Sequence, residues 1–476
     1  MSRYITTTLP YVNADPHLGH ALEFIEADCY VRALRLRGEE VFFNIGTDEH
    51  GAKVAKRAEE SGKVPKDFVD FYANQFKDFA KRLNISEDIF LRTTDPKHER
   101  AAQEMWKRCA ASGDIYKAEY EIKYCVGCEL EKTDSELVDG TCPLHPTLTI
   151  EIRKEENYFF RFSKYRGALL AHYEKHSDFV VPAGRFNEIR SFVGAGLKDF
   201  SISRPREKLS WGVAVPGDDA HIMYVWFDAL TSYLSAVGWP EDDAMFTKWW
   251  PVTHFAGKDN LRQQSAMFQA MLLSAGLPLS HQVFIHGFLT SGGQKMSKTL
   301  GNVIDPMAIV EKYGVDALRY ILLRHAHPFE DTDLTLENIH EYYTANLVNG
   351  LGNLVARIMK LCEDYMPNTF DIAPHLQGYG KDMLQDITRF SFNEAMDQIF
   401  AKVGAADAQM NNDAPFKKIK SDNAIDQEEA RKSIELLRGF LAAIAANLQP
   451  FMPETSAKIL EALRSNQKPE NLFPRI

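Results

Sequence analysis

The stretch YITTTLPYVNADPHLGHALEF, residues 4 to 24, joins a strand-like apolar run to the start of a long helical pattern. His17 and His20 lie three positions apart at this junction, with Gly19 between them. Three interpretations compete: two metal ligands, an ordinary polar helix start, and a phosphate site. A zinc site would need a third and a fourth ligand. Unpaired N–H groups at a helix N-terminus attract phosphate, and a glycine permits close approach of a nucleotide.

The segments around this junction predict an α/β fold. A helical pattern at residues 21–38, ALEFIEADCYVRALRLRG, is followed by a strand-like run at residues 39–46, EEVFFNIG. Strand, helix and strand in this order predict a right-handed crossover and a parallel sheet. Ligands of such sheets bind at the carboxyl ends of the strands. We therefore expect a doubly wound parallel sheet of the Rossmann type, with a ligand close to the two histidines.

Changes of pattern along the chain predict four regions. Sheet-like apolar runs return at residues 221–230, HIMYVWFDAL, and at residues 252–259, VTHFAGKD. Short alternating runs and a cysteine cluster lie before them, and helical periodicity dominates after them. The predicted regions are a first half of the sheet domain at 1–115, an insertion at 116–215, the second half of the sheet domain at 216–334, and a helix bundle at 335–476.

Composition narrows the class of protein. The chain has 476 residues, of which 45% are hydrophobic and 25% charged, as is ordinary for a globular protein of several domains. A formal charge of −11 argues against a broad, sequence-independent nucleic-acid binder, though not against an enzyme that holds RNA on one face. We find no secretory signal, no apolar run long enough to span a membrane, and no disulfide scaffold among the six cysteines. These features predict a cytoplasmic protein without a membrane partner.

A second glycine-containing stretch, GGQKMSKTLGN, occupies residues 292–302. Gly292 and Gly293 predict a mobile loop, and Lys295 and Lys298 lie three positions apart beyond them. Two ammonium groups on a hinged loop suit polyphosphate charge that develops during a reaction and then leaves. The alternative is a solvated basic turn. Each motif alone is a weak signal, but the two in this order favour a nucleotide-dependent enzyme.

These motifs resemble those of a known family. HLGH and KMSKT resemble the HIGH and KMSKS signatures of class I aminoacyl-tRNA synthetases. TLPYVNADPHLGH, GTDEHG, YVWFDALTSY and GKDN together resemble the methionyl-tRNA synthetases in particular, over essentially the whole chain. The resemblance implies activation of methionine by ATP, with Mg²⁺, to methionyl-adenylate, and transfer to the terminal adenosine of tRNA(Met), the initiator tRNA included. It also favours a monomer.

The resemblance assigns roles to both motifs. His17 and His20 would stabilise the transition state at the α-phosphate rather than bind a metal, and the loop lysines would hold the β- and γ-phosphates. The implied ATP-binding residues are His17, Gly19, His20, Gly257, Asp259, Lys295 and Lys298, of which the histidines and lysines are catalytic.

The resemblance also implies a methionine pocket. Asp48 of GTDEHG would receive the α-ammonium group, and aromatic walls suit a polarizable sulfur. From the residues alone, Asp48 could instead be a helix cap and Trp226 a core aromatic beside a strand. At positions 264 and 268, many relatives carry His and Trp. The implied methionine-binding residues are Leu9, Tyr11, Asp48, Trp226, Ala229, Tyr233, Gln264 and Phe268.

The insertion contains a cysteine cluster, YCVGCELEKTDSELVDGTCPLH. A CxxC pair followed by CxxH fits one closed, tetrahedral structural zinc site with the ligands Cys125, Cys128, Cys142 and His145. A redox pair is the competing interpretation, although CVGC lacks the strand-to-helix context of a thioredoxin-type motif. The resemblance identifies this segment as the single zinc knuckle of the family. The remaining cysteines, Cys29, Cys109 and Cys362, fall in helical patterns and are predicted core residues.

The helical region contains NGLGNLVARIMKL and NNDAPFKK, which resemble the anticodon-reading parts of the family. Asn353 and Arg357 lie one turn apart and can project from the same helix face. Phe416 takes a position where relatives often carry Trp, and it could stack on an unpaired base. Ordinary bundle packing is the alternative for all three residues.

Two other functions remain open at this stage. One is a class I synthetase for another apolar amino acid, although the branched-chain enzymes of that group carry a large editing insertion. The other is a non-catalytic tRNA-binding paralogue, which would have no need of the two histidines and two lysines.

Overall fold

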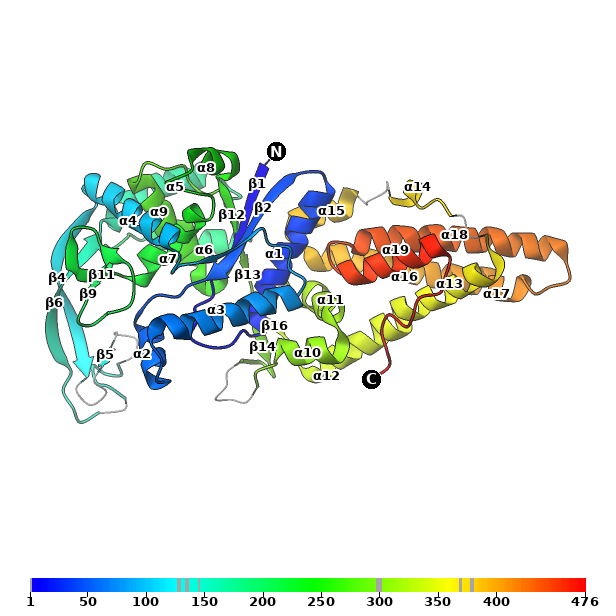
Figure 1. Cartoon of the computed structure of the whole chain (residues 1–476), viewed down its shortest axis with the longest axis horizontal. Coiled ribbons are helices and arrows are strands. Elements are labelled where there is room, and N and C mark those ends of the chain that lie inside the picture. The colour runs from blue at the N-terminus through cyan, green and yellow to red at the C-terminus, as the bar shows by residue number, and fades with distance from the viewer. Residues whose placement is uncertain are drawn as a thin grey trace.

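The computed structural model is elongated, with sheets at one end and helices at the other (Figure 1). The ribbon formed by β4 (Ile115–Cys125) and β6 (Glu151–Phe160) lies at the far end of the sheet portion. Among the helices of the described residues, none is long and apolar enough to cross a membrane. The described residues are 2–125, 130–132, 137–143, 146–296, 302–367, 370–376 and 381–476.

Six parallel strands form the central sheet in the order β3-β2-β1-β12-β13-β7. They are β1 (Ser2–Thr7), β2 (Glu40–Thr47), β3 (Ile89–Arg92), β7 (Val180–Val181), β12 (Val252–Gly257) and β13 (Gln282–His286). The strand order reverses between β1 and β12, and doubly wound sheets bind their ligands outside the carboxyl ends of the strands at such a point. The predicted α/β fold with a parallel sheet and a helical C-terminal region is confirmed.

Helix α1 (Leu18–Leu36) lies between the sheet and the helices beyond it. It contacts β1, β2 and β12 as well as α11 and α15, so 14 of its 19 residues are buried. A helix buried on most sides carries little amphipathic pattern. The other helices around the sheets are α2 (Ala52–Glu60), α3 (Pro65–Arg82), α4 (Pro96–Ala111), α5 (Arg166–Lys175), α6 (Ala183–Gly194), α7 (Val225–Ser235), α8 (Asp243–Trp249), α9 (Phe268–Ser274), α10 (Pro306–Tyr313) and α11 (Val315–His325).

The prediction of a sheet-like run at residues 221–230 is wrong over half of that run. β11 (Asp218–Met223) ends before the run does, and α7 begins at Val225. β11 pairs with β9 (Ser203–Pro205) and β10 (Ala214–Val215) in a small antiparallel sheet, not with the parallel strands. A short apolar run has no periodicity that separates a buried strand from the start of a buried helix.

Residues 116–215 also contribute to the central sheet. β7 pairs with β13 at the sheet edge, and two residues are too few to show a strand pattern. The rest of the region holds α5, α6 and an antiparallel sheet in the order β5-β4-β6-β8. The additional strands outside the central sheet are β5 (Leu130–Lys132), β8 (Phe200–Ser201), β14 (Leu289–Ser291), β15 (Gln294–Lys295) and β16 (Thr332–Asp333).

The helical region extends away from the sheets (Figure 1). Its first long helix is α12 (Leu336–Tyr342), which continues through π-helical turns at Tyr343–Gly352 into α13 (Asn353–Tyr365). The remaining helices are α14 (Ala373–Leu376), α15 (Lys381–Thr388), α16 (Phe392–Asp413), α17 (Pro415–Lys418), α18 (Ala424–Leu448) and α19 (Pro453–Ser465).

A buried ion pair connects α1 to this helical region. The side chains of Asp28 on α1 and Arg319 on α11 are both fully buried, with 2.7 Å between Oδ2 and Nη2. Arg319 also donates to the carbonyl oxygens of Phe451 at 2.7 Å and Pro450 at 3.0 Å, in the turn between α18 and α19. The Arg319 guanidinium group therefore connects α1, the helix that begins at the histidine motif, to the turn between α18 and α19.

Candidate active site

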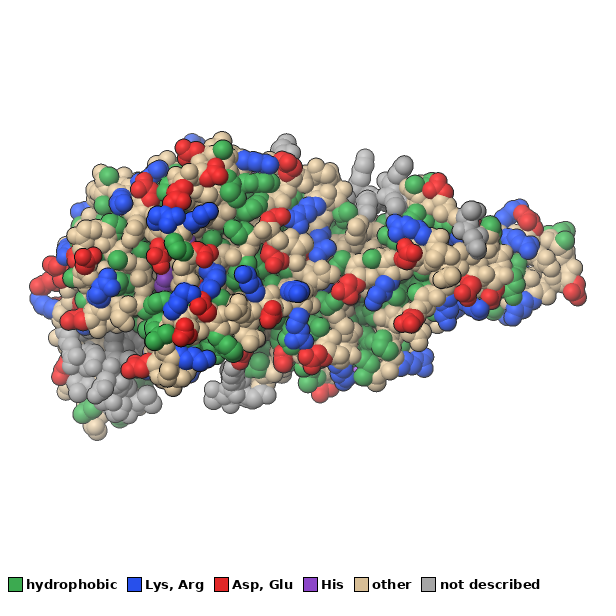
Figure 2. Space-filling view, viewed as in Figure 1, with side chains coloured by type: hydrophobic (Ala, Val, Ile, Leu, Met, Phe, Trp, Pro, Cys, Tyr) green, Lys and Arg blue, Asp and Glu red, His purple; other side chains and the backbone are tan. Residues whose placement is uncertain are grey.

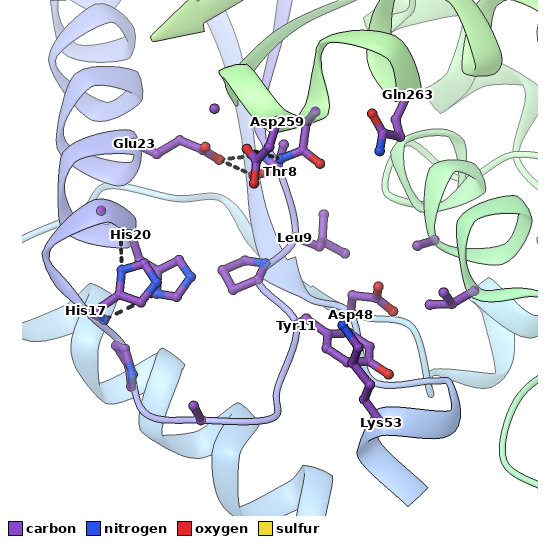
Figure 3. A pocket seen from close by; sticks show the side chains of 18 of the residues that line it. Thr8, Leu9, Tyr11, His17, His20, Glu23, Asp48, Lys53, Asp259 and Gln263 are labelled. Carbon is purple, nitrogen blue, oxygen red and sulfur yellow. Dashed lines mark hydrogen bonds between the residues drawn. The ribbon is translucent and has the colours of Figure 1, made fainter. Parts of the chain in front are cut away.

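A cavity of about 1440 Å³ opens at the switch point between β1 and β12. Its walls come from the loop after β1, the first turn of α1, the segment after β2, helix α7, and the ends of β12 and β13. Figure 3 shows how part of these side chains surround the space. Of the residues predicted from the sequence, the cavity brings together Leu9, Tyr11, His17, Gly19, His20, Asp48, Trp226, Ala229, Tyr233, Gly257, Asp259 and Gln264.

The two histidines cap the N-terminus of α1 through each other (Figure 3). Nδ1 of His17 accepts a hydrogen bond from the backbone N–H of His20 at 3.4 Å, and Nδ1 of His20 accepts one from that of His17 at 3.3 Å. Burial, followed by the charge of the neighbouring imidazole, keeps the pKa of His20 well below its usual range. Because each Nδ1 accepts, the ring proton is on Nε2, so each imidazole offers an Nε2–H donor.

Gly19 leaves room for this pair. The rings of His17 and His20 stack with 3.7 Å between their centroids. A β-carbon at position 19 would lie 3.1 Å from Nδ1 and Cε1 of His17, which is closer than ordinary van der Waals contact. Any side chain at position 19 would therefore displace the His17 ring from its capping position.

Asp48 places a buried carboxylate at the cavity wall. Backbone hydrogen bonds to Pro10 at 2.9 Å and from Val12 at 3.1 Å tie it to the loop after β1. The residue is 9% exposed, and its Oδ1 atom has no hydrogen-bond partner. Burial, reinforced by the nearby carboxylate of Asp228, raises the pKa of Asp48 well above its usual range. When Asp48 is ionised, its buried carboxylate lacks a counter-charge, and a bound cation would supply one.

The alternative role of Asp48 as a helix cap does not hold, because the N-cap residue of α2 is Gly51. Behind Asp48 lies a buried network that the sequence did not reveal. Asp228 on α7 bonds Nδ1 of His50 and Nε2 of His98, each at 2.6 Å. Despite burial, these two imidazoles hold the pKa of Asp228 well below its usual range. The charge on Asp228 therefore persists and disfavours ionisation of Asp48 in the empty site.

Aromatic side chains form the wall beside Asp48. Trp226 lies in the first turn of α7 and is 42% exposed, so the alternative of a core aromatic is wrong. Tyr233 is buried, and its hydroxyl accepts a hydrogen bond from Nε2 of Gln264 at 2.8 Å. Phe268 is fully buried and contacts the Tyr233 ring at a centroid distance of 5.6 Å. It supports the wall from behind instead of lining the cavity.

Further polar residues that were not predicted from the sequence line the cavity, and three of them, Thr8, Glu23 and His286, interact with one another. Glu23 on α1 accepts hydrogen bonds from the backbone and hydroxyl of Thr8 at 2.7 and 2.5 Å, and Nε2 of His286 lies 2.9 Å from its other oxygen (Figure 3 shows Thr8 and Glu23). Although burial disfavours the charged imidazole, Glu23 and the nearby Glu26 raise the pKa of His286 to about 9. The position of His286 at the carboxyl end of β13 was the available signal.

The described start of the lysine motif reaches this cavity. Lys295 belongs to β15, which pairs with β14, and the next residue, Met296, lines the cavity. Lys298 lies outside the described residues. The structure therefore brings the start of the motif to the site that contains the two histidines.

The predicted zinc ligands divide into two groups. Cys125 at the end of β4 and Cys142 are both buried, and neither is in a disulfide bond. Cys128 and His145 lie outside the described residues. Within the parts of the chain that the structure describes, no group of three or more His, Cys, Asp or Glu side chains is placed to hold a metal ion. The predicted core cysteines, Cys29, Cys109 and Cys362, are all fully buried, which confirms that interpretation.

A second cavity, of about 470 Å³, brings the three predicted anticodon residues together in the helical region. Asn353 and Arg357 come from α13, and Phe416 from α17 is 36% exposed. Arg357 is already engaged: Nη1 lies 2.6 Å from Asp407, and Nη2 donates to Asn411 at 2.9 Å. Its charge is therefore paired with a carboxylate of the bundle, while the Phe416 ring is partly exposed, with Nζ of Lys417 5.9 Å from its centroid.

The fold and the first cavity define a class of enzyme that binds a nucleotide at the switch point of a doubly wound sheet. The sequence family described as "tRNA synthetases class I (M)" matches residues 3–149 and 147–359. The methionine–tRNA ligase of Thermosynechococcus vestitus is 41% identical over 96% of this chain and 88% of its own. That of Thermotoga maritima is 39% identical over 98% of this chain and 76% of its own.

A solved structure agrees with these matches. Mycobacterium tuberculosis methionyl-tRNA synthetase in complex with methionyl-adenylate superposes with a TM-score of 0.88 at 36% identity, covering 100% of this chain and 98% of the other. The chain belongs to the methionyl-tRNA synthetase family of class I aminoacyl-tRNA synthetases.

Proposed function

We propose that this chain is a methionine–tRNA ligase that activates methionine with ATP and transfers it to tRNA(Met), including the initiator tRNA. The observation that carries the proposal is Asp48. Its buried carboxylate, of which Oδ1 has no hydrogen-bond partner, lies in a wall that also contains Tyr11 and Trp226, in the same cavity as the histidine-capped N-terminus of α1. An α-amino acid with an apolar side chain suits this surface, because its ammonium group would pair with the carboxylate and its side chain would contact the aromatic rings. In methionine that side chain is a polarizable thioether, which makes favourable contacts with aromatic rings.

In the first reaction, the methionine carboxylate attacks the α-phosphorus of ATP, and pyrophosphate leaves. The Nε2–H groups of His17 and His20, with the N-terminus of α1, would donate to the oxygens on which charge develops. Gly257 and Asp259 at the end of β12 would hold the nucleoside portion. Lys295 and Lys298 would bind the β- and γ-phosphates, and Mg²⁺ would accompany the ATP. In the second reaction, the terminal adenosine of tRNA accepts the methionyl group and AMP leaves.

Pyrophosphate exchange tests this proposal. ATP should incorporate labelled pyrophosphate when methionine is present and much less with leucine, isoleucine, valine or cysteine. Preference for another apolar amino acid would favour the first alternative function, and no exchange with any amino acid would favour a non-catalytic paralogue.

We also propose one structural zinc ion held by Cys125, Cys128, Cys142 and His145. Two of these residues, Cys125 at the end of β4 and Cys142, are buried, which supports the assignment. Four protein ligands would leave no open coordination position, so the ion would stabilise the insertion and take no part in chemistry. We retain the predicted division into regions 1–115, 116–215, 216–334 and 335–476, a monomeric state and a cytoplasmic location as predictions.

Metal analysis of the purified protein should give about one zinc per chain. Cys128→Ser should lose that zinc and lower the stability of the insertion, because metal-binding energy is also folding energy at such a site. Cys109→Ser is the matched control, since Cys109 is buried on α4 and is not a proposed ligand. A protein without zinc, or a chelated protein with unchanged unfolding, would contradict the assignment.

We propose that Asn353, Arg357 and Phe416 read the anticodon, and Phe416→Ala tests this. Loss of one base-stacking contact costs roughly 1–3 kcal/mol, so the KM for tRNA should rise about tenfold or more. Methionine and ATP kinetics should stay close to wild type, and preference for CAU over an altered anticodon should fall. Phe440→Ala is the control, because Phe440 is 39% exposed on α18 but does not line the second cavity. Unchanged anticodon preference in Phe416→Ala would mean that the ring only packs the bundle.

A further inference from the structure

Three cations line the second cavity, and they differ in whether a carboxylate is paired with them. Arg357 pairs with Asp407 at 2.6 Å, and Lys360 pairs with Asp364 at 2.7 Å and Glu363 at 3.2 Å. The third cation, Lys468, also lines the cavity. Among the described residues, no carboxylate lies within ion-pair distance of its ammonium group. Each of the other two cations has a carboxylate partner, so Lys468 is the cation without one among the described residues that line this cavity.

The chain around Lys468 is held in place at both ends. On one side, Asn466 is buried in a left-handed conformation, with a φ of 53°, and its Nδ2 donates to the carbonyl oxygens of Cys362 at 3.1 Å and Met366 at 3.3 Å. These carbonyls belong to the C-terminal end of α13 and the residue that follows it. Asn466 is the left-handed residue that ends α19, and its side chain connects that end to the end of α13. It sets the position at which the segment with Lys468 leaves the bundle.

On the other side, the segment packs against the π-helical turns before α13. Phe473 is buried, and its Cδ2 atom lies 3.2 Å from the position of a β-carbon at Gly352. The hydroxyl of Tyr343 donates to the carbonyl oxygen of Pro474 at 2.8 Å. Residues 466–474 therefore run along α13 towards its N-terminal end, and Lys468 lies between two anchored points, beside the cavity.

The position and chemistry of Lys468 favour one kind of ligand. Lysine is a compact point charge on a flexible stem, which suits a phosphate better than the edge of a base. The exposed Phe416 ring lines the same cavity and offers a stacking face. A base that stacks on the Phe416 ring would place the phosphate of its own nucleotide at the edge of the second cavity. The chain has a net charge of −11, and Figure 2 shows acidic and basic side chains interspersed over the helical region on this face. Attraction for RNA must therefore come from local, unbalanced cations.

We propose that Lys468 binds a backbone phosphate of the RNA loop that enters the second cavity, and that residues 466–474 serve as the element that positions it. This proposal rests on the proposed function, because the RNA is the tRNA of the aminoacylation reaction. Lys468 contributes affinity that is independent of the base sequence, whereas Phe416 contributes discrimination.

The salt dependence of tRNA binding tests this role. One lost phosphate contact on a single-stranded loop should reduce the slope of log K against log salt concentration by about 0.7. Lys468→Ala should therefore show this smaller slope, with affinity about two- to fivefold lower at low salt. Lys468→Arg should restore the slope because it keeps the charge. Lys458→Ala is the matched control, since Lys458 is an exposed lysine of α19 that does not line the cavity.

Binding is measured with two tRNAs that differ only in the anticodon, and methionine-dependent pyrophosphate exchange is measured in parallel. Equal weakening of both tRNAs by Lys468→Ala, with a normal exchange rate, supports the proposal. An unchanged salt slope, or the same change in Lys458→Ala, overturns it. Failure of the wild-type protein to exchange pyrophosphate would instead reject the proposed function. Loss of anticodon preference in Phe416→Ala together with unchanged tRNA binding by Lys468→Ala would leave that function standing without a role for Lys468.

Discussion

The Asp48→Asn variant should bind methionine between about 30-fold and several thousand-fold more weakly than the wild-type protein. Truncating one member of a buried, hydrogen-bonded charge pair costs about 2–5 kcal/mol, and about 1.4 kcal/mol corresponds to a tenfold change in affinity. The substitution keeps the size of the side chain and removes only the charge that faces the ammonium group. The loss should appear in the methionine dependence of pyrophosphate exchange, with the KM for ATP close to wild type.

Unfolding measurements separate this loss from a structural defect. Burial raises the pKa of Asp48 above its value in the unfolded chain, which is about 3.9. The folded state therefore binds more protons, and this carboxyl lowers the stability of the free protein as the pH rises above about 4. Asp48→Asn should be at least as stable as the wild type at pH 7 without methionine.

Methionine should raise the unfolding midpoint of the wild type and not that of the variant. A methionine analogue without the α-amino group provides the control, because it should bind both proteins equally weakly. Retention of methionine affinity within threefold in Asp48→Asn would reject the assignment of the ammonium site.

The second large effect is expected for Arg319→Met, which should lower the free energy of unfolding by about 3–5 kcal/mol. The substitution removes the buried cation that pairs with Asp28, leaves that carboxylate with the partly exposed Arg32, and removes the hydrogen bonds to the carbonyl oxygens of Pro450 and Phe451. Because Asp28 lies on the helix that carries His17 and His20, pyrophosphate exchange should also decline at temperatures below the new midpoint. Denaturant titration, followed by far-ultraviolet circular dichroism, measures the effect.

Arg32→Met is the matched control, since Arg32 pairs with the same carboxylate at 2.7 Å but is 20% exposed. It should cost about 1 kcal/mol. Combining Arg319→Met with Asp28→Asn should recover part of the loss, because the carboxylate that lost its buried partner is then absent. If Arg319→Met proves insoluble, Arg319→Lys should show an intermediate loss. Equal losses in Arg319→Met and Arg32→Met would show that burial of the pair is not what stabilises this junction.

The sequence predicted the part of the molecule that local patterns encode. HLGH after a strand-like run indicated a helix start at the carboxyl edge of a sheet, and α1 begins at Leu18 as that pattern required. The order of strands and helices indicated a parallel sheet because crossover handedness leaves few alternatives. The motif spacing also carried a family resemblance, which the matches to methionine–tRNA ligases confirm. The length and periodicity of the helical region were sufficient to predict it.

Local sequence patterns did not predict the secondary structure where an element has few residues or where one apolar run contains two kinds of element. The two-residue strand β7 has no periodicity, and the apolar run at 221–230 contains both the end of a strand and the start of a helix. Phe268 was expected to line the methionine pocket, but the fold places it against the Tyr233 ring and outside the cavity.

The sequence by itself determined the family and the sheet and helix classes, because local patterns and motifs encode them, and it predicted which side chains carry the chemistry. Only the tertiary structure decided how those side chains are charged and partnered. Glu23 meets His286 across 263 positions, and Asp228 meets His50 across 178. Burial and partners at such separations set whether a carboxylate is ionised. For the same reason Asp48 faces the cavity without a counter-charge, a property that no local pattern contains.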